Sequence, residues 1–209
     1  EEITRLTDSR NTIRNKMVVG QKRPVIYLSN LITCAAAGIW MCAIGFLTYL
    51  CMGLLLLDGF ELPAETVLLL VLCTLLLSVA FSSIFTLIAM LNQNKAVSAV
   101  ICILGMFLLL FVGIYVDGRL QEPETFDSYT YVDDSGNLVT DEAEPNPNYL
   151  RGTKREIYEF LNDFLPGGQA LQISNHSAQQ PWLLMVYSGI IFAGTTGAGL
   201  LFFQKKDLK

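Results

Sequence analysis

The sequence predicts an all-α integral membrane protein, with four transmembrane helices and a small extracellular domain before the last of them. Apolar residues make up 52% of the 209 residues, and charged residues only 16%. Mean hydropathy is positive, and four long apolar runs carry no charged side chain. A water-soluble domain of this length needs a more polar surface, so we expect the chain to be embedded in a membrane.

The four apolar runs set the expected order of segments. Transmembrane helices are predicted over residues 25–57, 66–91, 96–116 and 181–204. The first run has 33 residues without a charge, and at ~1.5 Å per residue it is longer than a hydrocarbon core of ~30 Å requires. This helix must therefore tilt, bend or begin outside the hydrocarbon.

The charged residues indicate which side of the membrane each connecting segment occupies. Residues 1–24 carry six bases and three acids, whereas residues 117–180 carry twelve acids and four bases. Three lysines lie in residues 205–209, and Lys95 is the only charge between the second and third runs. Because bases favour the cytoplasmic side, we expect a multi-pass protein of the cell membrane with both ends of this chain in the cytoplasm.

The basic segment before the first run, residues 1–24, has the pattern of a short amphipathic helix. Asp8 or Ser9 is a suitable helix cap, and Gly20 suits a left-handed residue just past the end. Ile13 and Met17 fall on one face. Such a helix lies on the membrane surface or docks into a groove on a soluble partner, and the alternative is a solvated basic cluster that only sets the topology.

Three motifs resemble one family of membrane proteins. The first is Thr12-Ile13-Arg14-Asn15-Lys16 followed by Gly20, Arg23, Tyr27 and Leu28. The second is Leu165-Pro166-Gly167-Gly168-Gln169-Ala170-Leu171, and the third is Phe203-Gln204-Lys205-Lys206-Asp207-Leu208-Lys209. In order and spacing the chain is similar to the permease subunits of type-2 ATP-binding-cassette exporters, of the Gram-positive bacterial type.

The resemblance implies a mechanism and a set of partners. Such permeases usually have six membrane helices, so two more are expected ahead of Glu1. They work as homo- or heterodimers with separate cytoplasmic ATPase subunits, which bind ATP and Mg, so no cofactor is expected in this chain. The segment of residues 1–24 would be the coupling elbow on which the ATPases push. Its candidate contact residues are Ile13, Arg14, Asn15, Lys16, Met17 and Arg23.

Small and hydroxyl residues in the apolar runs are candidates for helix packing or for a polar path. Ser78, Ser82 and Thr86 recur at four-residue spacing, which suits either role, and we favour packing. Gly38 belongs to a similar small-residue face of the first run. The strongest candidate for a helix-contact face lies in the last run and consists of Gly189, Ala193 and Gly197.

The extracellular segment, residues 117–180, divides into two parts. Residues 130–132 and 138–140 predict a small hairpin around a longer turn. The aspartates of this turn lack the alternating spacing of a calcium loop, so a solvated turn is the better interpretation. Apolar residues at three- and four-residue steps predict an amphipathic helix over about 150–165, stopped by Pro166-Gly167-Gly168 and lying on the outer headgroup layer.

Several kinds of chemistry are excluded by the sequence. It contains no phosphate-binding Gly-x-x-x-x-Gly-Lys-Ser/Thr loop, no His-Glu-x-x-His motif and no cysteine outside the apolar runs. Ion-coupled carriers usually keep ionisable side chains at mid-membrane, and the four runs contain no Asp, Glu, Lys, Arg or His. We therefore expect a non-enzymatic membrane subunit that is driven from outside.

Two other interpretations stay open. The chain could be a non-transporting sensor or assembly subunit whose acidic outer loop binds a ligand, or a passive channel lined by Ser78, Ser82 and Thr86. The sequence does not identify the substrate of such an exporter, although the acidic outer segment suits cationic antimicrobial peptides. The resemblance implies that such peptides or drugs are exported. No part of the sequence suggests nucleic-acid binding, whereas membrane lipid is an expected neighbour.

Overall fold

The computed structural model describes residues 20, 22–56, 63–92, 94–133, 136–141 and 143–205. In these ranges the elements are α3 (Arg23–Leu56), α4 (Ala64–Leu91), α5 (Lys95–Leu120), β1 (Tyr129–Val132), β2 (Leu138–Asp141), α6 (Thr153–Phe164), α7 (Pro166–Ser174) and α8 (Pro181–Lys205). Helices α3, α4, α5 and α8 are each long and apolar enough to cross a membrane. The prediction of four such helices is confirmed, and the structure fits a membrane-embedded protein.

The long helices begin and end close to the predicted limits, and α5 differs most. It continues to Leu120, four residues past the predicted end of the apolar run. The backbone N–H of Gln121 donates to the Asp117 carbonyl at 3.0 Å, which completes the last turn. The end of a helix depends on backbone hydrogen bonds rather than on hydropathy, so a helix can extend beyond its apolar part.

The beginning of α3 follows the chemistry expected of Gly20 and Pro24. Gly20 has a φ of +90°, which is the predicted left-handed conformation. Pro24 lies in the first turn of α3, where its missing N–H has no hydrogen bond to lose. The N–H of Ile26 donates to the Lys22 carbonyl at 3.2 Å. The long helix therefore starts directly after the basic segment.

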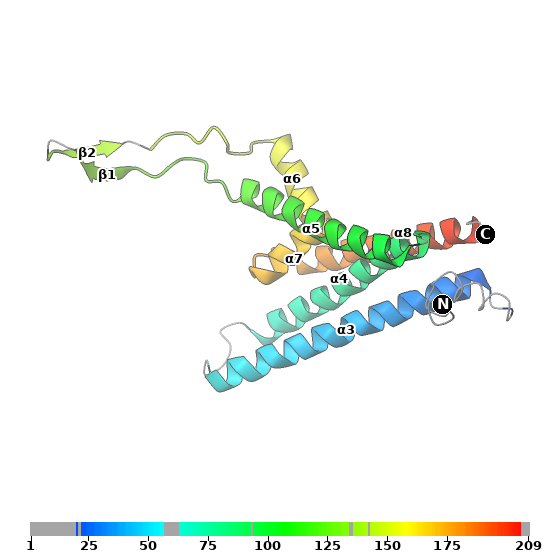
Figure 1. Ribbon diagram of the computed structural model, residues 1–209. Coiled ribbons are helices and arrows are strands. Elements are labelled where there is room, and N and C mark those ends of the chain that lie inside the picture. The colour runs from blue at the N-terminus through cyan, green and yellow to red at the C-terminus, as the bar shows by residue number, and fades with distance from the viewer. Residues whose placement is uncertain are drawn as a thin grey trace.

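Helix α4 lies at the centre of the arrangement. It packs against α3, α5, α7 and α8, with its most extensive contact on α8. Figure 1 shows α3 and α5 on opposite sides of α4. Much of the outer surface of these flanking helices is apolar, as at Trp40, Leu55 and Leu108, which are 70%, 82% and 64% exposed. Such surfaces suit lipid or another membrane helix rather than water.

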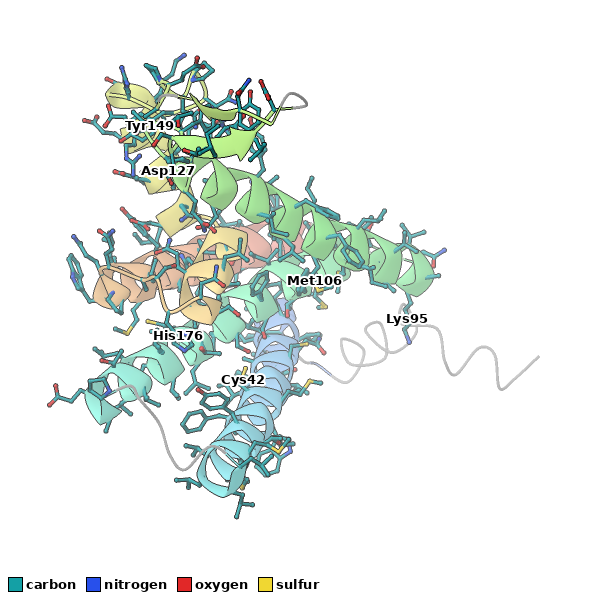
Figure 2. All side chains as sticks on the ribbon, turned by 90° about the vertical axis from the view of Figure 1, so that its left-hand side faces the viewer. Cys42, Lys95, Met106, Asp127, Tyr149 and His176 are labelled. Carbon is teal, nitrogen blue, oxygen red and sulfur yellow. The ribbon has the colours of Figure 1, made fainter. Side chains whose placement is uncertain are left out.

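The helices define two ends of the molecule. At one end, which we call the terminal end, α3 begins, α8 ends and the connection from α4 to α5 lies nearby (Figure 1). At the opposite end, the loop end, the β1–β2 hairpin projects beyond the helices (Figure 1). The side chains that carry nitrogen and oxygen gather around Asp127 and Tyr149 in this region (Figure 2). This polar end contrasts with the apolar sides of the helices.

The structure contains the predicted hairpin. Strands β1 and β2 pair antiparallel, with Tyr129 opposite Asp141 and Val132 opposite Leu138. The turn is closed by two hydrogen bonds to Asp133, from the Gly136 N–H to its carbonyl at 3.0 Å and from the Asn137 N–H to its Oδ1 at 2.9 Å. Gly136 has a φ of +81°, a conformation that residues with a side chain rarely adopt.

The segment after the hairpin differs from the prediction in one respect. Helix α6 occupies most of the region expected to be helical, but Pro166-Gly167-Gly168 does not only stop it. After Leu165, which is extended, Pro166 begins a second helix, α7, in a position that favours proline. Helix α7 packs against α5 and α4, and it also contacts α6, to which Leu165 connects it.

Candidate functional site

The predicted hydroxyl row of α4 lies at two different contacts. Ser78 and Ser82 face α3 at Gly38, where an added Cβ would come within 2.7 Å and 3.3 Å of their Oγ atoms. Ser82 donates to the Ser78 carbonyl at 2.8 Å, within its own helix. Thr86 is buried in the interior, 3% exposed. The absence of a side chain at Gly38 therefore allows α3 to approach α4 closely, which is the packing role expected of small residues.

A hydrogen bond that the sequence did not single out joins α4 to α8. Ser83, which is completely buried, lies 2.6 Å from Thr195 through the two hydroxyl oxygens. Thr195 also donates to the Ile191 carbonyl at 2.7 Å. Ser83 comes one position after Ser82, so its side chain points to α8, whereas Ser78 and Ser82 face α3. The pair of adjacent serines, Ser82 and Ser83, was the only sign in the sequence that α4 carries hydroxyl groups on two faces.

Within the described residues, α8 packs through a different face from the one predicted. Gly189, Ala193 and Gly197 are exposed, and no described atom lies within 4 Å of a Cβ added at either glycine. The buried residues of α8 are Leu184, Ser188, Gly199 and Phe203. Because α8 is apolar on all sides, the spacing of small residues did not determine which face packs inside the chain; the larger Leu184 and Phe203 fill the interior instead.

A cluster at the terminal end joins three helices. Its buried apolar members are Ile26, Tyr27, Leu31, Met90 and Phe203. The Tyr27 ring packs against Phe203, with centroids 6.2 Å apart, and it fills the space where Gly199 lacks a side chain. Arg23, the one predicted coupling residue that is described, donates from Nη1 to the Gln204 carbonyl at 2.7 Å. The start of α3 is thus attached to the end of α8.

The other predicted coupling residues are Ile13, Arg14, Asn15, Lys16 and Met17, and they lie outside the described residues.

A cleft opens between α3 and α4 next to the Gly38 contact. Its volume is about 1070 Å³, and its walls are ten residues of α3 between Ile39 and Leu50, together with Val71, Thr74 and Leu75 of α4 and Ser174 of α7. Almost all of these side chains are apolar, and the Thr74 hydroxyl donates to the Leu70 carbonyl of its own helix. The cleft has the size of a small-molecule site and suits an apolar occupant.

Helices α6 and α7 are attached to the long helices by a buried amide. Gln169 is completely buried; its Nε2 donates to the Asp163 carbonyl at 2.8 Å, and its Oε1 accepts from the Ser188 hydroxyl of α8 at 2.7 Å. Gln172 donates to Asp163 Oδ1 at 2.9 Å. All polar atoms of the Gln169 side chain are therefore satisfied, as a buried amide requires.

Two glycines bring α7 against α5. A Cβ at Gly113 would lie 2.5 Å from the backbone carbon of Gly167, and a Cβ at Gly167 would overlap the Leu109 carbonyl. These are backbone contacts, which cannot move aside as a flexible side chain does. The Leu165–Leu171 motif thus supplies a helix start, a backbone contact and the buried amide, roles that the sequence alone did not reveal.

At the outer rim of this region two tyrosines contact each other. The rings of Tyr115 and Tyr158 lie 6.5 Å apart, and the hydrogen bond with Tyr115 raises the pKa of Tyr158. Among the described residues, no group of three His, Cys, Asp or Glu side chains is placed to hold a metal ion.

Comparison with known proteins gives no assignment: no protein-family model, curated protein or solved structure matches this chain.

Proposed function

We propose that this chain is a permease subunit of an ATP-driven exporter of the type-2 ATP-binding-cassette kind. It forms part of the translocation path in the cell membrane, as a homo- or heterodimer, and is driven by separate cytoplasmic ATPase subunits that hold ATP and Mg. The terminal end faces the cytoplasm in this proposal, and the loop end is extracellular. The resemblance of the three sequence motifs to such permeases supports the family in this proposal.

The observation that carries the proposal is the attachment of the start of α3 to α8. Arg23 and Tyr27 of α3 contact Gln204 and Gly199 of α8, and Met90 of α4 belongs to the same buried cluster. A push on the basic segment that precedes α3 would therefore move three long helices together. Rigid-body movement of packed helices is a common way to open and close a path.

The charge distribution supports an external source of energy. Within the described ranges, the ionisable Asp, Glu, Lys and Arg residues of the four long helices lie near helix ends, as with Glu65, Lys95 and Asp117. A carrier driven by protons or ions usually needs such groups at mid-membrane. A motor subunit that hydrolyses ATP removes that requirement.

The cleft between α3 and α4 supports a path for an apolar or amphipathic substrate. It lies beside the close contact of Gly38 with Ser78 and Ser82. A tilt of α3 about this contact would change the width of the cleft. In the proposed dimer, a second copy and membrane lipid would complete its open side.

The experiment that tests the proposal is reconstitution with an ATPase subunit encoded beside this chain. We expect the two proteins to copurify, and we expect a transported substrate to stimulate ATP hydrolysis in proteoliposomes. Alanine substitutions from Ile13 to Met17 should abolish both association and stimulation. The matched control replaces Arg151 and Lys154 at the loop end with alanine, which should leave association unchanged. Full association and transport by the Ile13–Met17 variant would contradict the coupling mechanism.

A second candidate function is a non-transporting sensor or assembly subunit. It is favoured by the projecting β1–β2 hairpin, whose exposed β1 side chains are open to a ligand or a partner protein (Figure 1). The neighbouring gene separates the two functions, because an adjacent ATPase with a phosphate-binding loop favours transport. Ligand binding at the loop end in a protein that neither associates with an ATPase nor transports would favour the sensor.

A further inference from the structure

Residues 121–148 are called the acidic ribbon here, and its described residues extend away from the helices at the loop end. They include both strands of the hairpin and the two chain segments that lead to it. All four side chains of β1 are exposed, and Leu138 of β2 is 76% exposed. In Figure 1 the hairpin projects beyond the ends of the helices. Its strands are thus open to a binding partner.

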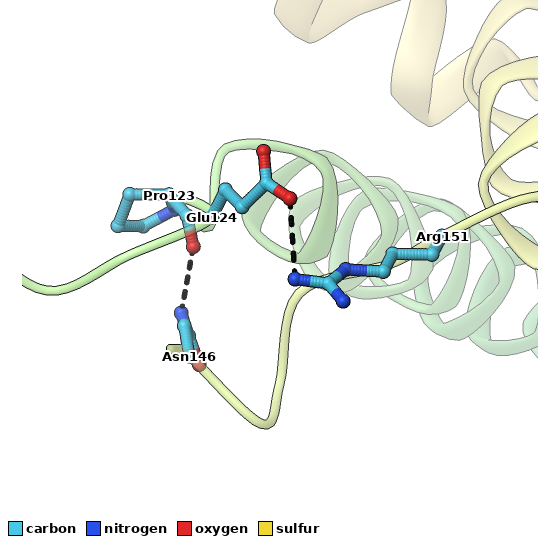
Figure 3. A network of polar contacts seen from close by, with 4 residues as sticks. All are labelled: Pro123, Glu124, Asn146 and Arg151. Carbon is cyan, nitrogen blue, oxygen red and sulfur yellow. Dashed lines mark hydrogen bonds and ion pairs between the residues drawn. The ribbon is translucent and has the colours of Figure 1, made fainter. Parts of the chain in front are cut away.

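The base of the acidic ribbon is held in place by side-chain contacts. Asn146, which is 4% exposed, donates from Nδ2 to the Pro123 carbonyl at 3.0 Å and to Glu122 Oε2 at 2.8 Å. Arg151 and Glu124 form an ion pair at 3.1 Å (Figure 3). Both charged side chains are largely exposed, so the buried amide contributes most of the attachment.

Among the described residues, the two strands of the hairpin pack mainly against each other. A sheet of two strands has two open edges, and an isolated hairpin is only marginally stable in water. The described strands bear exposed Tyr129, Tyr131 and Val132, at 61%, 43% and 61%. The rings of Tyr129 and Tyr131 lie 5.7 Å apart on one face. An added strand would satisfy an open edge and cover part of this apolar surface.

The charge of the acidic ribbon determines which partner fits. Residues 121–148 contain eight acids and no base. The same ribbon of a second copy would be repelled, whereas lysine or arginine side chains would be attracted to the carboxylates and to the tyrosine rings. An extended peptide also pairs its backbone with a sheet edge, which is a common mode of peptide recognition.

We propose that the acidic ribbon binds an extended cationic peptide as an additional strand. Backbone hydrogen bonds at the open edge provide the pairing, the carboxylates attract the basic side chains, and Tyr129 and Tyr131 contact both cations and apolar groups. The further statement that this peptide is the transported substrate rests on the proposed function. Binding itself does not.

The test uses the full chain in lipid nanodiscs and three peptides of ten residues. The first alternates lysine and valine, the second alternates glutamate and valine, and the third alternates lysine and proline. The lysine–proline peptide has the same charge as the first but fewer backbone N–H groups, so it pairs poorly with a strand. Binding is measured by fluorescence anisotropy at low and high salt.

The variants separate the ribbon from the rest of the protein. Tyr129→Ser with Tyr131→Ser removes the ring pair, and Asp127→Asn with Glu144→Gln removes two ribbon charges. The matched control, Glu65→Gln with Glu156→Gln, removes two exposed acids elsewhere. We expect each ribbon variant to weaken lysine–valine binding by about tenfold, and the control to bind like the unmodified chain.

Each result supports or overturns the proposal. Preference for the lysine–valine peptide over both others, weakened by salt and by the ribbon variants, supports it. Equal binding of the lysine–proline peptide would overturn strand addition, and unchanged binding by the ribbon variants would overturn the site. A shift from dimer to monomer in the ribbon variants would assign the ribbon to a contact between copies instead. Peptide binding that does not stimulate ATP hydrolysis in the reconstituted complex would overturn the statement that the peptide is the transported substrate, and it would leave the binding site intact.

Discussion

The ring of Tyr27 occupies the position that a side chain at Gly199 would need. Tyr27 lies near the start of α3 and Gly199 near the end of α8, so this contact joins two segments that are far apart in the sequence. A Cβ at Gly199 would overlap the Tyr27 hydroxyl and ring, and Tyr27 is completely buried. A tyrosine at position 27 therefore fits only if position 199 carries no side chain.

The first prediction concerns this pair. Gly199→Ala should destabilise the protein by about 1–3 kcal/mol, because the extra methyl group forces a buried ring to move. Thermal unfolding in detergent should show a lower midpoint. Tyr27→Phe, which keeps the ring, should be tolerated much better than Tyr27→Ala, which leaves a cavity.

Gly197→Ala is the matched control for Gly199→Ala. It lies two residues away in the same helix, and no described atom lies within 4 Å of its added Cβ. Exchange of glycine for alanine inside a helix is favourable by about 1 kcal/mol on propensity alone. If Gly199→Ala were as stable as Gly197→Ala, the packing of Tyr27 against α8 would be wrong.

The second prediction concerns the contact of α7 with α5. Gly167→Ala should push α7 away from Leu109 and Gly113, since backbone atoms on both sides cannot yield. We expect a lower unfolding midpoint and faster proteolysis of the loop end. Gly105→Ala, in the same helix as Gly113 but without described atoms near its added Cβ, should have neither effect. Equal behaviour of the two variants would contradict the close approach.

The third prediction concerns the hydrogen bond between Gln169 and Ser188. Gln169→Met and Ser188→Ala should each lower the free energy of unfolding. The double variant should lose less of this free energy than the sum of the two single losses. The coupling energy should be about 1 kcal/mol. A control cycle combines Gln169→Met with Thr33→Val on α3 instead of Ser188→Ala. The coupling energy between these two substitutions should be close to zero. Additive losses in the first cycle would show that the bond contributes nothing.

The elements that the sequence predicted well are those with a strong local pattern. Runs without charge predicted the four long helices within a few residues of their observed limits. Two short runs of strand-forming residues on either side of the turn-forming residues Asp133–Asn137 predicted the hairpin, because the turn determines which residues of the two strands pair. The left-handed Gly20 was predictable for the same reason, since few residues other than glycine adopt that conformation.

The contacts between helices were much less predictable. Helix α8 is apolar all round, so the spacing of Gly189, Ala193 and Gly197 gave no indication that larger residues on another face would pack inside the chain. Helix α7 was missed because proline and glycine usually interrupt helices. Here Pro166 starts a helix. Gly167 is required because the backbone of α5 approaches it closely at Leu109, and a contact between distant segments leaves no local pattern in the sequence.

The last prediction tests which side of the membrane each end of the molecule faces. After replacement of the five native cysteines, Asn137→Cys in the hairpin should react with a membrane-impermeant maleimide in intact cells. Lys205→Cys, at the end of α8, should react only after permeabilisation, because bases favour the cytoplasmic side. Ile103→Cys, within the apolar part of α5, serves as the control and should react with neither protocol. Labelling of Lys205→Cys in intact cells would place the start of α3 on the same outer side, since Arg23 is bonded to Gln204. A cytoplasmic ATPase could then not reach the coupling segment, and the proposed mechanism would fail.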